Sequence, residues 1–134
     1  MSLLDVDRRT VRLFVLPDLV AILAFVLVGE YQHEMLAYTL THPLRFLGVV
    51  APFLVGWAVA ASVLRAYSTR ARSWRGLIGW TLLSWVVADA LAQGLLLTGI
   101  FPIDFNEVFA VVVAVFGGLF LCIARGVTFF AASR

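Results

Sequence analysis

The stretch Gly76–Thr98, GLIGWTLLSWVVADALAQGLLLT, decides the fold class of this protein. It is long enough to cross a bilayer, because about 20 mostly apolar residues at 1.5 Å each span a hydrocarbon core of roughly 30 Å. One acid, Asp89, lies well inside it, and Gln93 follows one helical turn later. An unpaired, charged carboxylate at that depth costs on the order of 2.5–3.5 kcal/mol. Other segments must therefore shelter Asp89, pair it or keep it protonated.

The composition of the whole chain points to lipid as its solvent. Of 134 residues, 63% are hydrophobic and 13% charged, and the mean hydropathy is +1.02. Soluble domains have about 45–50% apolar and about 25% charged residues. A single domain of this size cannot bury that excess in a core. The ten basic residues form no basic face, which argues against nucleic-acid binding.

Four apolar stretches predict four transmembrane helices, over about 13–32, 46–64, 76–98 and 108–124 of a single domain, 1–134. Pro17 and Asp18 fall in the first turns of the first span. Proline is tolerated there and an acid complements the positive helix end. Asp18 is therefore interpreted either as helix-start chemistry or as a candidate functional acid near the cytoplasmic mouth.

The distribution of Arg predicts the orientation. Four of the ten lie in one short loop, Arg65–Arg75 (RAYSTRARSWR), which the positive-inside rule places in the cytoplasm. Five more basic residues place both termini on the same side: Arg8, Arg9, Arg12, Arg125 and Arg134. The tenth, Arg45, stands alone in the opposite loops. We expect an all-α, integral membrane bundle of four transmembrane helices in the cell membrane, multi-pass, with N- and C-termini cytoplasmic.

Two stripes of small residues predict close helix packing. In the second span Gly48, Pro52, Gly56 and Ala60 recur every fourth residue, and in the fourth span Ala110, Ala114 and Gly118 do the same. Four helices leave little room to bury Asp89, so we expect a homo-oligomer or a larger membrane complex.

Depth along the spans predicts a polar cluster. At 1.5 Å per residue Asp89 lies about 20 Å above Arg75, and Glu30 lies roughly 20–27 Å above the start of its helix. Both fall in the outer half of the bilayer, where Arg45 is the only cation within reach. We expect an intramembrane polar cluster of Glu30, His33, Arg45, Asp89 and Gln93. It is interpreted either as a set of hydrogen bonds that hold the helices together or as a functional site.

The motifs of known chemistry are missing from the sequence. It has no Gly-rich phosphate loop, HExxH, CxxC or GxSxG. Its one cysteine, Cys122, excludes an intrachain disulfide, and its two histidines lack a metal spacing. We therefore predict no catalytic residue, no metal and no cofactor.

Several features resemble a family of small prokaryotic membrane proteins, domain of unknown function 3054. They are Asp18 opening the first span, Gly29 followed four residues later by His33, and Pro52-Phe53-Leu54-Val55-Gly56-Trp57 in the second span. The resemblance covers most of the chain, roughly Pro17 to Arg125. It implies the topology and carries no activity.

Three functional hypotheses remain open. The first is a non-catalytic accessory subunit or homo-oligomer, favoured by the small-residue stripes. The second is a small proton- or ion-linked transporter that uses Asp89 with Glu30 and His33. The third is a binder of an apolar ligand such as a lipid, quinone or pigment, with the candidate walls Trp57, Trp80 and Trp85. An enzyme is least expected, because no nucleophile–base pair can be assembled.

Overall fold

The computed structural model describes residues 6–133, which fold into helices joined by short connections. The prediction of an all-α protein is confirmed, since the described residues contain no strand. Four of the helices are long and apolar enough to cross a membrane, as predicted. The elements in chain order are α1 (Arg8–Gln32), α2 (Leu36–Thr41), α3 (Pro43–Val63), the short 3-10 helix η1 (Thr69–Arg72), α4 (Trp74–Leu96) and α5 (Glu107–Ala132).

Local sequence explains most helix starts. Pro43 begins α3, where its missing N–H leaves no hydrogen bond unmade. Ser73 caps α4 by accepting a hydrogen bond from the Gly76 N–H at 3.2 Å. Asn106 caps α5 in the same way, accepting from the Phe109 N–H at 3.1 Å. These caps satisfy backbone donors that have no partner inside the helix.

Two helices are longer than their apolar sequence suggested. The first begins at Arg8, so Pro17 and Asp18 lie inside α1 and not in its first turns. The last continues to Ala132, so Arg125 lies inside α5 and not beyond its end. Asp18 and Arg125, both expected at the boundaries of their helices, therefore lie within them.

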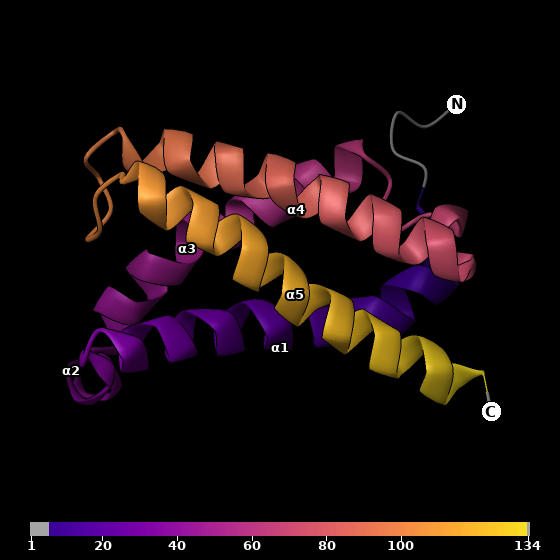
Figure 1. Ribbon diagram of the computed structural model, residues 1–134, viewed down its shortest axis with the longest axis horizontal. Helices are drawn as coiled ribbons and strands as arrows, with labels where there is room; N and C mark the ends of the chain where they lie inside the picture. The colour runs from indigo at the N-terminus through magenta and orange to yellow at the C-terminus, as the bar shows by residue number, and fades with distance from the viewer. Residues whose placement is uncertain (1–5, 134) are drawn as a thin grey trace.

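The bundle has two chemically different ends (Figure 1). The start of α1, the end of α5 and η1 lie at one end, called here the Arg-rich end because seven of the ten Arg residues belong to it: Arg8, Arg9, Arg12, Arg65, Arg70, Arg72 and Arg75. Helix α2 and the α4–α5 connection lie at the other end. It is called here the acidic end, and its charged residues are Glu30, Glu34, Asp104, Glu107 and Arg45.

Each long helix packs on two of the others. Helix α4 packs against α3 and α5, and α1 packs against α5 and, more lightly, α3. Figure 1 shows α1 and α5 crossing and then diverging toward the acidic end. The core between them is aromatic, with Trp85 completely buried against Phe25, Phe53 and Trp57.

Many large apolar side chains face outward. On α5 alone, Val111, Val115, Ile123 and Val127 are each more than half exposed. Exposing so much apolar surface to water would be unfavourable at about 25 cal/mol per Å². The outer face of the bundle therefore suits a lipid environment.

A close contact between α3 and α4 leads to a prediction about Gly56. A Cβ atom added to Gly56 would lie 2.4 Å from the carbonyl oxygen of Ala88, whereas one added to Gly94 would meet nothing within 4 Å. We expect Gly56→Ala to force α3 from α4 and lower the free energy of unfolding by about 1–3 kcal/mol. The matched control, Gly94→Ala, should be neutral or stabilising by up to about 1 kcal/mol. Reversible unfolding in mixed micelles measures both, and equal effects would contradict the packing.

Candidate functional site

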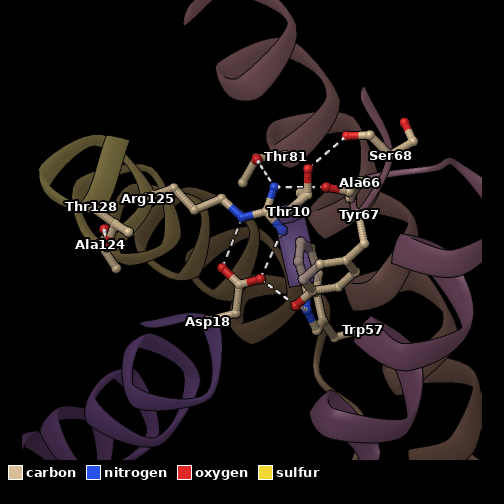
Figure 2. A network of polar contacts seen from close by, with 10 residues as sticks. All are labelled: Thr10, Asp18, Trp57, Ala66, Tyr67, Ser68, Thr81, Ala124, Arg125 and Thr128. Atoms are coloured by element: carbon tan, nitrogen blue, oxygen red, sulfur yellow. Dashed lines mark hydrogen bonds and ion pairs between the residues drawn. The ribbon is translucent and has the colours of Figure 1, made fainter. Parts of the chain in front are cut away.

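A fully buried ion pair joins the first and last long helices (Figure 2). Arg125 of α5 donates from Nε to Oδ1 of Asp18 at 2.8 Å and from Nη2 to Oδ2 at 2.7 Å. Both side chains have an exposed fraction of zero. The parallel, two-point geometry is the strongest form of an Arg–carboxylate contact. Residues 107 positions apart in the sequence are thereby fixed to each other.

The other long helices and the loop after α3 complete this network. Nη1 of Arg125 donates to Thr81 Oγ1 of α4 and to the Ala66 carbonyl oxygen, both at 3.0 Å. The Tyr67 hydroxyl donates to Asp18 Oδ2 and accepts a hydrogen bond from Trp57 Nε1 of α3. All four long helices therefore meet at one set of hydrogen bonds.

The surroundings of the pair explain how its charges are tolerated. The rings of Phe14, Trp57 and Tyr67 lie 5.0–5.5 Å from the guanidinium carbon. Aromatic faces attract cations, and the hydrogen bonds replace lost water contacts. Burial and then the Asp18 carboxylate raise the pKa of Tyr67, which keeps the phenol protonated as a donor. Because its groups bond one another inside the core, we assign this network a structural role.

A surface clasp supports the network at the Arg-rich end. Asp7 accepts hydrogen bonds from Arg72 at 2.8 and 3.0 Å, and its N–H donates to the Tyr67 carbonyl oxygen. Hydrogen bonding from Arg72 holds the pKa of Asp7 well below its usual range. Thr10 donates to the Ser68 carbonyl oxygen at 3.1 Å, so the start of α1 is tied to the loop that carries Tyr67.

Part of the predicted polar cluster is brought together at the acidic end. Glu30 lies 3.2 Å from Arg45, measured from Oε2 to Nη1, and also accepts a hydrogen bond from Thr39 at 3.0 Å. Glu30, His33 and Arg45 all line the same cavity. The connection that contains α2 positions them, because it returns the chain from α1 to α3.

Asp89 and Gln93 do not join that group. Gln93 Nε2 donates to Asp89 Oδ1 at 3.0 Å within α4, and neither residue lines the cavity. The side-chain amide oxygen of Gln93, Oε1, is buried and has no hydrogen-bond partner among residues 6–133. The expected contact of Asp89 with His33 or Arg45 is likewise not found among the hydrogen bonds and ion pairs of the described residues.

The three tryptophans expected as ligand walls also lie outside the cavity lining. Trp57 and Trp85 pack against each other in the core, with ring centres 6.3 Å apart, and Trp85 donates to the Val113 carbonyl oxygen at 2.9 Å. Trp80 instead carries the Arg70 guanidinium 3.9 Å above its ring. The expected ligand walls Trp57, Trp80 and Trp85 thus pack and hydrogen-bond elsewhere.

The cavity itself lies between α1, α3 and α5 at the acidic end. Its volume is about 530 Å³. Phenylalanines supply its aromatic walls, and its polar side chains come from the helix ends and the α4–α5 connection. Besides Glu30, His33 and Arg45, its lining includes Phe25, Phe53, Phe109, Val108, Val112, Asp104 and Asn106. Among the described residues no group of three or more His, Cys, Asp or Glu side chains could hold a metal ion.

Sequence reasoning missed two parts of these sites. Arg125 was used only as a marker of the membrane boundary, although the apolar sequence after it, Gly126–Ala132, is a signal that the helix continues. The phenylalanine walls of the cavity left no signal, because a Phe in an apolar helix looks the same whether it packs in a core or lines a cavity.

The fold and these sites define a small helical bundle with four helices suited to spanning a membrane. Residues 15–128 match the family described as protein of unknown function (DUF3054), which confirms the resemblance. The match covers most of the chain, and the protein belongs to this family. Neither a curated protein nor a solved structure matches the chain.

The role of Tyr67 in the network makes a second prediction. Tyr67→Phe removes the acceptor of Trp57 Nε1 and one donor to Asp18, leaving a buried N–H unpaired. We expect the free energy of unfolding to fall by about 1–3 kcal/mol. The control is Tyr31→Phe, at a residue that is 65% exposed, which should change little. Equal losses in the two variants would show that the Tyr67 hydroxyl contributes nothing.

Proposed function

We propose that this protein binds an amphipathic ligand inside the membrane, in the cavity between α1, α3 and α5. The observation that carries the proposal is the cavity, which has aromatic and aliphatic walls and gathers its polar side chains at one end. Ligand sites in proteins have volumes of about 300–1,000 Å³, mostly apolar walls and a few polar groups that orient the ligand. The volume of about 530 Å³ falls within that range.

The surroundings of the cavity suggest a route from the lipid. Val108 and Val112 of α5 line the cavity and are also 73% and 41% exposed on the outside of the bundle. The cavity therefore borders the apolar outer surface. A ligand dissolved in the bilayer could enter sideways without crossing water, with its apolar body among Phe25, Phe53 and Phe109.

The other two functional hypotheses have less support. Proton- or ion-linked transport relied on Asp89 acting with Glu30 and His33, but Asp89 bonds Gln93 within its own helix. The small residues expected at a helix interface are used inside the chain, since Gly56 contacts α4 and Gly118 lies under Leu82 and Trp85. An accessory or homo-oligomeric role and a transport role stay predictions.

We retain the orientation inferred from the sequence as part of the proposal. Seven Arg residues lie at the Arg-rich end, while Arg45 is alone at the acidic end. By the positive-inside rule the Arg-rich end faces the cytoplasm and the protein spans the cell membrane several times. Arg134 lies outside the described residues, and Arg125 belongs to the buried network, so neither contributes to this inference.

Filling the cavity tests the proposal. Val112→Trp should place an indole in the cavity, whereas the control Val111→Trp changes the neighbouring residue, which is 64% exposed and does not line it. A photoactivatable fatty alcohol in nanodiscs should label cavity residues of the wild type and the control, and labelling should fall at least about tenfold in Val112→Trp, the factor expected for about 1.4 kcal/mol. Labelling spread evenly over the outer surface, unchanged by Val112→Trp, would contradict binding.

A further inference from the structure

The charges around the cavity select among amphipathic ligands. Its lining contains two carboxylates, Glu30 and Asp104, and one guanidinium, Arg45. The two carboxylates and the one guanidinium sum to one net negative charge. A single positive charge on the ligand would balance it, whereas a negative charge would double the imbalance in a region of low dielectric constant.

The one cation of the lining is already engaged. Arg45 donates from Nη1 to Glu30 Oε2, and its guanidinium also lies over the ring of Tyr38 at 5.4 Å. An anionic ligand would share Arg45 with Glu30, whose carboxylate already offsets the charge of the guanidinium. Fatty acids and other anionic amphiphiles are thus disfavoured both by the net charge of the lining and because the charge of Arg45 is already offset by Glu30.

Glu30 keeps one carboxylate oxygen uncommitted. The side chain is only 8% exposed. Both hydrogen bonds that it accepts, from Thr39 and Arg45, end on Oε2. Oε1 accepts no hydrogen bond from the described residues. Because Glu30 lines the cavity, Oε1 is a charged acceptor on a buried side chain that a ligand there could meet.

The geometry points to a protonated amine, and we infer that the ligand is an amphiphile whose ammonium head donates to Glu30 Oε1 while its apolar body occupies the cavity. This inference rests on the proposed binding function and narrows the ligand class. The aromatic walls add to the selection, since the face of a phenylalanine ring attracts a desolvated cation. Two further acids, Glu34 and Glu107, lie at the same end and favour the approach of cations.

A set of ligands with one tail and four heads tests the inference. In nanodiscs, decylamine, decanol, decanoate and decyltrimethylammonium compete with the photoactivatable alcohol, and each is compared at equal membrane concentration. Decylamine should compete at about tenfold lower concentration than decanol, as expected for one charge-assisted hydrogen bond. Decanoate should be the weakest. Decyltrimethylammonium, which has the charge without an N–H donor, should fall between decylamine and decanol.

Variants connect the preference to Glu30. Glu30→Gln should remove the advantage of decylamine over decanol, and Arg45→Gln, which removes the competing cation, should increase it. The control is Glu34→Gln, because Glu34 carries the same charge at the same end without lining the cavity. Should Glu30→Gln fail to fold, the advantage of decylamine over decanol is compared between Arg45→Gln and Glu34→Gln. An increase in Arg45→Gln alone supports the inference, and equal values in the two variants contradict it.

The outcomes separate this inference from the proposed function. Equal competition by decylamine and decanol, or an equal effect of Glu34→Gln and Glu30→Gln, would overturn the amine assignment and leave ligand binding intact. Competition by none of the four ligands, together with no labelling of the cavity, would overturn both.

Discussion

The buried ion pair between Asp18 and Arg125 is the constraint on which the rest of this bundle depends. Lipid gives helices no hydrophobic reason to associate, so specific polar contacts and close packing must hold them. Here one guanidinium is bonded to α1, α4 and the loop after α3, and Tyr67 extends the contact to Trp57 of α3. Removing either charge would leave the other buried without a partner, which costs far more than the intact pair contributes.

The ion pair lies toward the Arg-rich end of the bundle, whereas the cavity lies at the acidic end. The ion pair holds α1 and α5 together, and the Asp7–Arg72 clasp ties η1 to the residue before α1 at the Arg-rich end. Toward the acidic end α1 and α5 diverge (Figure 1). Residues of these two helices and of α3 line the cavity at that end. A half held together by hydrogen bonds and a half that contains a cavity are consistent with the proposed ligand binding. Glu30 and Arg45 give that hollow its polar end.

Sequence reasoning predicted the helices well and the sites only in part, for identifiable physical reasons. Apolar length and turn chemistry are local, so four long helices and the family resemblance followed directly. Depth arithmetic gives height along a helix axis but not direction around it. Glu30, His33 and Arg45 line one cavity, while Asp89, at similar depth, bonds Gln93 instead. Arg125 was misplaced because boundary arginines and buried arginines look alike until a partner such as Asp18 is located in space.

A double-mutant cycle between Asp18 and Arg125 is the most direct test of the central claim. Unfolding free energies are measured in mixed micelles for Asp18→Asn, Arg125→Gln and the double variant. Each single change should cost about 3–5 kcal/mol, and the double variant should cost much less than their sum. Asp104→Asn combined with Arg125→Gln is the control, and it should be additive because Asp104 lies at the acidic end. Additive losses in the Asp18–Arg125 cycle would show that the bundle does not depend on this ion pair.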